Sequence, residues 1–135
     1  MITETSEAIL NQFNNTSELR DTLTGGLWFV RAPQENTMPY GVFDFISVTP
    51  TEYMGGKDDN IKLVDLQISM FTDDDDGAYK INKMASRFDA GFNWEVLNIA
   101  DHKCIKCANA NMQTPIYVDE VWQITLLYEM QIIKE

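Results

Sequence analysis

An alternating stretch at residues 62–72, KLVDLQISMFT, limits the folds open to this chain more than any other segment does. Its apolar positions are Val64, Leu66, Ile68 and Met70, and the polar positions between them are Asp65, Gln67 and Ser69. Successive side chains of a β-strand point to opposite faces of the sheet. The pattern therefore predicts a strand with one buried face. Residues 40–48, rich in aromatic and β-branched side chains, predict a second strand directly before it.

The connection between these two strands, residues 49–61, is too long for a tight hairpin turn. Connections of this length in small domains are usually functional or disordered. This one combines an apolar pair, a glycine pair and charged residues, a mixture suited to becoming ordered on a partner. The predicted contact residues are Tyr53, Met54, Gly55, Gly56, Lys57, Asp58, Asp59 and Asn60. The alternative is that Tyr53 and Met54 fold back on the protein's own sheet.

Helical signals occur in two places. Residues 5–13 carry an apolar stripe, and Asn15 with Glu18 predicts the capping box of a second short helix that ends at Gly25-Gly26. A central helix is predicted at residues 75–90, with Gly91 as the first residue beyond its end.

The remaining strands are a short one at residues 27–31, one at 103–111 that Thr114-Pro115 ends, and a long one at 119–132. Residues 92–99 have no clear period and are expected to be irregular. These elements predict an α+β fold. We expect an antiparallel sheet of four to five strands, packed by the N-terminal helical segment and the central helix. A length of 135 residues fits one domain spanning residues 1–135.

The charge balance excludes one large class of function. The chain has 21 acidic and 10 basic residues, a net charge of -11, so its surface repels the phosphates that nucleic-acid-binding proteins hold. No apolar run approaches the roughly 20 residues that span a bilayer, and the first ten residues do not resemble a signal peptide. We therefore expect synthesis in the cytosol.

No residue pattern predicts a metal site or a cofactor site. The run from Asp73 to Asp76 suggests calcium, but an EF-hand loop with its glycine at Gly77 would need a glutamate where Lys83 stands. The aspartates instead fit the N-terminus of the central helix, where carboxylates accept backbone N–H groups. An adventitious cation site is the alternative.

No residue pattern predicts catalysis either. Phosphate-binding glycine loops, nucleophile elbows and zinc-protease motifs are absent from the sequence. Cys104 and Cys107 are three residues apart, which would put their thiols on opposite faces of a strand, and we expect both to be ordinary reduced cysteines. The only histidine, His102, is expected to be an exposed turn residue. The sequence therefore favours a protein that is not an enzyme and carries no metal or cofactor.

A succession of motifs across residues 32–89 resembles the tail-completion, or tail-terminator, family of long-tailed bacteriophages. The motifs are Pro39-Tyr40, then Ile46-Ser47-Val48-Thr49-Pro50, then a strand around Gln67, then a helix start with Ala78 and Ile81. The similarity covers about half of the chain well and the rest in element order. Residues 92–111 match no motif of that family.

The resemblance implies a structural virion protein that forms a homo-oligomeric ring, expected to be a hexamer. Such a ring caps the tail tube and joins it to the head connector. The implied partners are further copies of the chain, the major tail-tube protein and a head–tail connector or stopper protein, while DNA passes through unbound. The implied location is the tail or neck of the virion, assembled in the host cytoplasm.

Two other readings of the sequence stay open. The chain could be a head–tail connector stopper or another neck protein, which would bind the portal side instead of the tube. From a different class, it could be a small soluble ligand-binding domain or an enzyme of unknown substrate.

Overall fold

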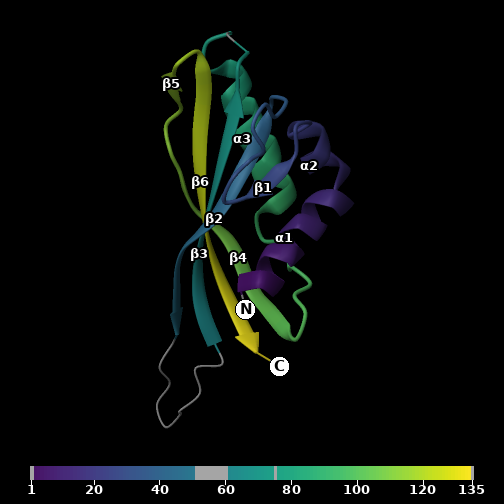
Figure 1. Cartoon of the computed structure of the whole chain (residues 1–135). Helices are drawn as coiled ribbons and strands as arrows, with labels where there is room; N and C mark the ends of the chain where they lie inside the picture. The colour runs from purple at the N-terminus through teal and green to yellow at the C-terminus, as the bar shows by residue number, and fades with distance from the viewer. Residues whose placement is uncertain (1, 51–60, 75, 135) are drawn as a thin grey trace.

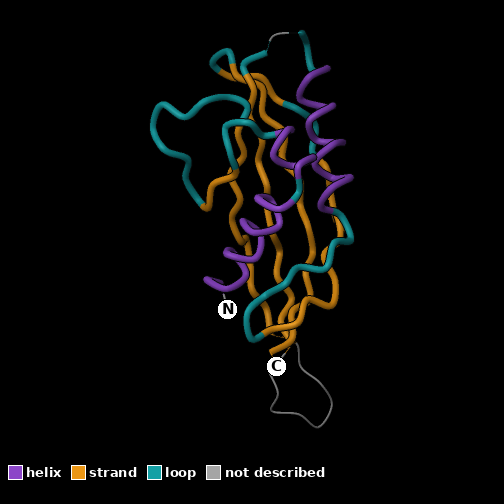
Figure 2. Tube along the Cα trace, turned by 90° about the vertical axis from the view of Figure 1, so that its right-hand side faces the viewer, coloured by secondary structure: helices purple, strands orange, loops and turns teal. Residues whose placement is uncertain are grey.

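The computed structural model describes residues 2–50, 61–74 and 76–134. A long, twisted β-sheet has three helices on one face, and its other face carries none of them (Figures 1 and 2). This arrangement confirms the predicted α+β fold with an N-terminal helical segment and a central helix. The elements in chain order are α1 (Ile2–Asn15), α2 (Ser17–Thr22), β1 (Leu27–Phe29), β2 (Tyr40–Pro50), β3 (Ile61–Thr72), α3 (Tyr79–Phe92), β4 (His102–Met112), β5 (Ile116–Val118) and β6 (Val121–Lys134).

The strands lie in the order β1-β2-β3-β6-β4, and β5 pairs with the start of β6. All paired strands are antiparallel except β1 and β2, which are parallel. The sheet agrees with the expected antiparallel sheet of about four to five strands except in two details. Residues 30–39 carry the chain back to the end of the sheet where β1 began, so β2 runs in the same direction. The sequence pattern also missed β5, which is only three residues long.

The predicted alternation of β3 decides which face of the sheet is buried. Its apolar residues point to the helices and are at most 2% exposed. The facing residues of β6 complete this side of the sheet, and α1, α2 and α3 cover it with their own apolar stripes. The main contributors from the helices are Ile9, Phe13, Leu19, Ile81, Met84, Ala85, Phe88 and Phe92. One hydrophobic core therefore lies between a single helix layer and a single sheet.

The helix ends differ from the expected ones. The residue preceding α2 is Thr16, not Asn15, and no side chain caps this helix, so the predicted capping box with Glu18 is wrong. Helix α2 ends at Thr22 with Leu23 as its C-cap residue, so the expected stop at Gly25-Gly26 is wrong, and the positive φ of Gly26, 95°, belongs to the turn that follows. Tertiary packing of Leu19 into the core, and not a local cap, holds the short helix in place.

Helix α3 begins later and ends later than predicted. Asp76 still accepts a hydrogen bond from the backbone N–H of Lys80, at 3.3 Å, as expected for a carboxylate near a helix start. Gly91 is not beyond the helix but inside it. A Cβ atom on Gly91 would lie 2.9 Å from Cδ2 of Leu19, so the glycine lets α2 and α3 approach closely.

Strand β4 contradicts the expected placement of the two cysteines. The register between β4 and β6 shifts between Cys104 and Lys106, because Ile105 is an extra residue in the ladder. Because of this extra residue, Cys107 faces the same side of the sheet as Cys104, and both cysteines are buried in the core. Burial raises the pKa of both thiols, that of Cys107 to about 12. Both groups therefore stay protonated near neutral pH, as the prediction of ordinary reduced cysteines requires.

A polar cluster connects the end of α3 to the sheet. The hydroxyl of Tyr128 in β6 donates to Asp89 Oδ1 at 2.8 Å, and Asn109 Nδ2 in β4 donates to the same oxygen at 3.1 Å. The backbone N–H of Asn109 in turn donates to Asn93 Oδ1 at 2.7 Å. Tyr128 is 1% exposed, so these bonds satisfy a hydroxyl that water cannot reach.

The raised pKa of the buried Tyr128 hydroxyl predicts that the protein loses stability at high pH. Burial, followed by the hydrogen bond to the Asp89 carboxylate, raises its pKa above the ordinary value. The folded state then holds this proton more tightly than the unfolded state does, so the free energy of unfolding falls as the pH rises above about 10. We expect Tyr128→Phe to be less stable than the natural chain by about 1.5–3 kcal/mol at pH 8. We also expect this variant to lose less stability between pH 8 and pH 11, measured by urea unfolding. Equal losses in the two proteins would contradict this assignment.

Candidate partner-binding surfaces

The loop that the sequence singles out, with Tyr53, Met54, Gly55, Gly56, Lys57, Asp58, Asp59 and Asn60, lies outside the described residues. The structure does place the two ends from which it starts. Pro50 and Lys62 are paired across β2 and β3, at the end of the sheet opposite the start of α3 (Figure 1). The predicted contact loop therefore extends from two neighbouring central strands, and its role stays a prediction.

The sheet face turned away from the helices is covered by no described helix (Figure 1). It mixes apolar and polar side chains, since Ile46 is 56% exposed and Leu63 is 40% exposed. On the same face, toward the end of β3, Ser69 Oγ and Thr125 Oγ1 lie 3.2 Å apart and share a hydrogen bond, and both residues are buried. A mixed surface of this kind resembles the average composition of a non-obligate protein interface.

Two carboxylates face each other on this open face. Asp65 in β3 and Glu129 in β6 are directly paired in the ladder, and like charges in that position destabilise a sheet. Ser47 Oγ donates to Asp65 at 2.7 Å, while the Lys106 ammonium is 4.0 Å from Glu129 and half-exposed. Two hollows of about 280 and 220 Å³ flank the pair, and both are lined by Asp65 and Glu129. The two adjacent carboxylates make this part of the open face negatively charged.

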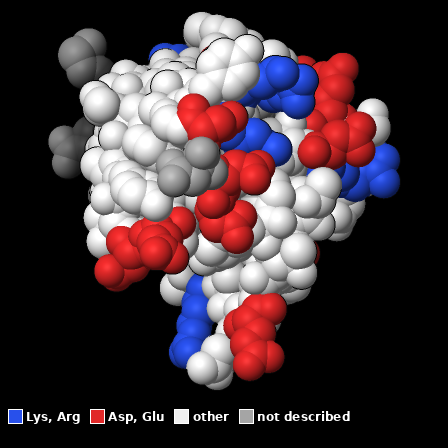
Figure 3. Space-filling view, turned by 90° about the horizontal axis from the view of Figure 1, so that it is seen from above, with Lys and Arg blue, Asp and Glu red and all other residues white. Residues whose placement is uncertain are grey.

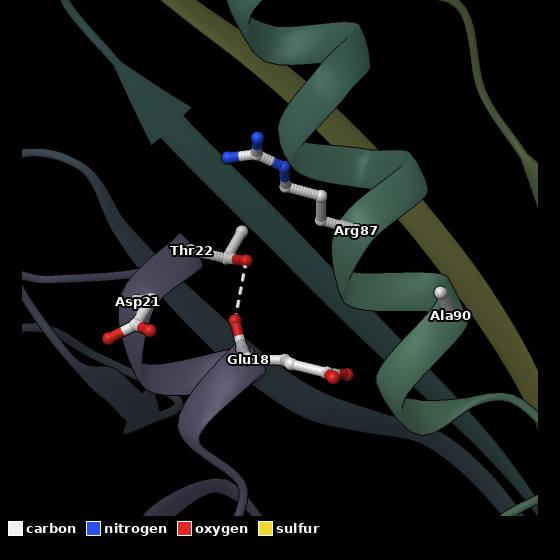
Figure 4. Close-up of a pocket in the computed structure, with 5 residues that line it drawn as sticks. All are labelled: Glu18, Asp21, Thr22, Arg87 and Ala90. Atoms are coloured by element: carbon white, nitrogen blue, oxygen red, sulfur yellow. Dashed lines mark hydrogen bonds between the residues drawn. The ribbon is translucent and has the colours of Figure 1, made fainter.

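The helix face carries a cleft of about 300 Å³ between α2 and α3 (Figure 4). It is lined by Glu18, Asp21, Thr22, Arg87 and Ala90. Figure 4 shows the Arg87 side chain reaching from α3 toward α2, and the Glu18 side chain reaching from α2 toward α3. Thr22 Oγ1 donates to the Glu18 carbonyl at 2.7 Å, and Asp21 points away from the hollow. Sequence reasoning missed this cleft because it depends on how the two helices cross.

An exposed apolar patch lies beside the edge of β4. Trp94 and Val96 are more than two-thirds exposed, and Ile105 is about half-exposed. The backbone N–H of Trp94 donates to the Cys107 carbonyl at 2.7 Å, so residues 93 and 94 partly cover this edge strand. The Lys106 ammonium lies 6.0 Å from the centre of the Trp94 ring. No periodic pattern marks residues 92–99 in the sequence, and the patch was not predicted.

The end of the molecule at the start of α3 is acidic. Thr72 pairs with Trp122, so the aspartates after β3 and the β5–β6 turn with Asp119 and Glu120 lie at the same end. Figure 3 views this end and shows several acidic side chains on it. Lys80 forms an ion pair with Asp74 at 3.1 Å. Among the described residues, no group of three or more His, Cys, Asp or Glu side chains is placed to hold a metal ion.

His102 differs from its predicted setting. It is the first residue of β4 and half-buried, not an exposed turn residue, and its Nδ1 lies 2.7 Å from the Ala100 carbonyl. Within the described parts of the chain, no helix is long and apolar enough to cross a membrane.

The chain matches no protein-family model and no curated protein. Solved structures do match it. A chain in the virion of a native gene transfer agent particle has a TM-score of 0.75 at 14% identity, covering 91% of this chain and 90% of that one. A second solved chain has a TM-score of 0.68 at 12% identity, covering 100% of this chain and 97% of that one. This chain shares its fold with a virion component. In each comparison the shared fold covers almost the whole length of both chains.

The facing carboxylates of the open sheet predict a stabilising substitution. Glu129→Gln keeps the side-chain shape but removes both the repulsion with Asp65 and the ion pair with Lys106. Because that ion pair is long, at 4.0 Å, and partly exposed, we expect the lost repulsion to outweigh it and the free energy of unfolding to rise by about 0.2–1 kcal/mol at low salt. The gain should shrink in 1 M salt, which screens exposed charges. Glu35→Gln, in an exposed loop, is the control and should change little. Urea unfolding at both salt concentrations measures the effect, and a less stable Glu129→Gln protein would contradict it.

Proposed function

We propose that this chain is a virion assembly protein of the tail-terminator type, which forms a hexameric ring between a phage tail tube and the head connector. The observation that carries this proposal is the fold shared over 91% of the chain with a component of a gene transfer agent virion. The motif order across residues 32–89 supports the same assignment from the sequence side. The role is structural, without catalysis or a cofactor.

The charge of the chain suits a ring through which DNA passes. Each copy has a net charge of -11, so six copies carry about -66. Such a ring repels phosphates, and DNA slides through it without being held. The acidic Asp65 and Glu129 on the open sheet face contribute to this charge.

The partners in this proposal are further copies of the chain, the major tail-tube protein and the connector or stopper protein. The loop with Tyr53 and Met54 supplies apolar anchors for one of these contacts. The described residues that flank this loop, Pro50 and Ile61, lie at one end of the sheet (Figure 1).

Molecular mass in solution tests the ring. Light scattering should give about 93 kDa for six copies of 15.5 kDa, or a larger mass that includes this ring once tail-tube protein is added. A strict monomer at high concentration that forms no ring with tail-tube protein would overturn the proposal. Binding to a portal-side protein but not to the tube would instead indicate a stopper.

The loop makes a second prediction. Replacing residues 51–61 with Asn-Gly should join Pro50 and Lys62, which already pair, by a tight turn and leave thermal stability nearly unchanged, because surface loops add little to stability. Head–tail joining should be lost. A ten-residue Gly/Ser replacement is the control for loop length, and it should fold and fail in the same way. Joining that persists in either variant would remove the loop from the contact.

A further inference from the structure

Two exposed apolar patches lie along the edge of the sheet that β4 and β5 form. The Trp94 patch, described above, consists of Trp94, Val96 and Ile105. The β5 patch consists of Ile116, Tyr117 and Val118. Each of these six side chains is between 45% and 69% exposed. Large apolar side chains that gather at the surface mark interaction sites, so each patch needs a partner that covers it.

The backbone beside both patches has a conformation that ordinary residues rarely adopt. Trp94 has a φ of 64°, in the left-handed region that disfavours bulky side chains. The two residues that join β5 to β6, Asp119 and Glu120, have φ values of 51° and 65°. A two-residue hairpin turn with two positive φ angles strongly prefers Asn-Gly. Strain of this kind clusters at functional sites, where the residue type is needed for another reason.

The charges beside the two patches are opposite. Strand β4 contains Lys103 and Lys106 and no acidic residue. The Lys106 ammonium lies 6.0 Å from the centre of the Trp94 ring, so this charge borders the Trp94 patch. The turn after β5 presents the exposed carboxylates of Asp119 and Glu120. Among the described residues, no ion pair involves Lys103 or either residue of the turn, so these charges are open to a complementary partner.

One copy cannot bring its own two patches together. The Trp94 N–H donates to the Cys107 carbonyl, and Cys107 pairs with Met130 of β6. Ile116 pairs with Gln123 of the same strand, about 23 Å away along β6. Because the sheet twists, β5 lies at the upper left of Figure 1, and the segment that joins α3 to β4 lies at its lower right. The two patches are thus on opposite sides of the molecule.

We propose that the Trp94 patch of one copy binds the β5 patch of a second copy. In this contact Trp94 packs on Ile116 and Val118, which share one face of β5. The two lysines of β4 lie against the two carboxylates of the β5–β6 turn. Each copy uses two different surfaces, so the contact is head-to-tail, and such contacts give closed rings when the rotation between copies closes. The inference rests on the ring in the proposed function and names its contact.

A charge-swap series tests this contact. Lys103→Glu should weaken self-association at least fivefold, because it places a carboxylate against the acidic turn. Adding Glu120→Lys in the same chain should return the association constant to within threefold of the natural value. Lys83→Glu makes the same charge change at an exposed site of α3 outside both patches and should alter association less than twofold. Glu35→Lys is the matched control for the turn, since Glu35 is an exposed glutamate with a φ of 66°. Analytical ultracentrifugation measures association, and circular dichroism verifies the folds.

The strained turn supplies a second test, in which stability and association change in opposite directions. Asp119→Asn combined with Glu120→Gly removes both carboxylates and gives the turn the residues that it prefers. We expect the Tm to rise by about 2–5 °C, measured at a concentration where both proteins are monomeric. Self-association should nevertheless weaken at least tenfold. A variant that gains stability and associates as well as the natural chain would show that the turn serves the fold alone, and would overturn the contact.

A disulfide cross-link tests the apolar part of the contact without changing a charge. Chains with Val96→Cys are mixed with chains carrying Ile116→Cys under copper phenanthroline, and a disulfide-linked heterodimer is expected. Cys104 and Cys107 are buried and stay unreactive. Val30→Cys, at another exposed valine, replaces Val96→Cys as the control and should give little product.

The outcomes separate this inference from the proposed function. A ring whose mass is insensitive to Lys103→Glu and to the turn replacement overturns the contact and leaves the ring in place. A cross-link between two Val96→Cys chains also overturns it, because that product indicates a two-fold contact. Association into open chains that the variants weaken supports the contact and counts against the ring. A monomer that forms no cross-link overturns both. If Trp94→Ala abolishes binding to tail-tube protein and leaves self-association unchanged, the tube covers the Trp94 patch, and the second copy is the wrong occupant.

Discussion

The pairing of β3 with β6 determines most of this structure. The two strands pair continuously from Ile61 with Ile133 to Thr72 with Trp122, without a register shift. Because their alternation is never interrupted, every second residue of both strands faces the helices over the full length of the sheet. Both flanking strands contain bulges, β2 near Ile46 and β4 near Ile105 and Ala110. The regular central pair thus sets the buried face, and the outer strands adapt to it.

This division explains which features were predictable. The alternating faces of β3 and β6 follow from the sequence alone, and the apolar stripes of α1 and α3 identify the helix layer that covers them. The two cysteines show where such reasoning fails. One extra residue in β4, Ile105, reverses the expected face of Cys107, and no local pattern in the sequence marks a bulge there. The end of α3 was predicted wrongly for a related reason. Gly91 lies inside the helix and contacts Leu19, a residue far away in the sequence.

The candidate surfaces were less predictable than the fold. Composition and loop length singled out the loop between β2 and β3, since glycines, apolar anchors and charges stand together there. The α2–α3 cleft and the patch around Trp94 depend on helix crossing and on an irregular segment, and neither leaves a periodic trace in the sequence. Facing carboxylates such as Asp65 and Glu129 become visible only once the strand register is known.

Unbalanced charges on two different faces restrict the kind of assembly the chain can join. Asp65 faces Glu129 on the open sheet, while Glu18 and Arg87 stand unpaired with each other in the cleft on the helix side. Natural sequences tolerate local conflicts of this kind mainly where function requires them. A two-fold dimer buries the same patch on both copies, so it would leave one of these surfaces unused. A head-to-tail contact brings different surfaces together, and repetition of that contact around one axis gives every copy the same neighbours. This distribution of charge is compatible with the cyclic assembly proposed above, in which each copy uses two different surfaces.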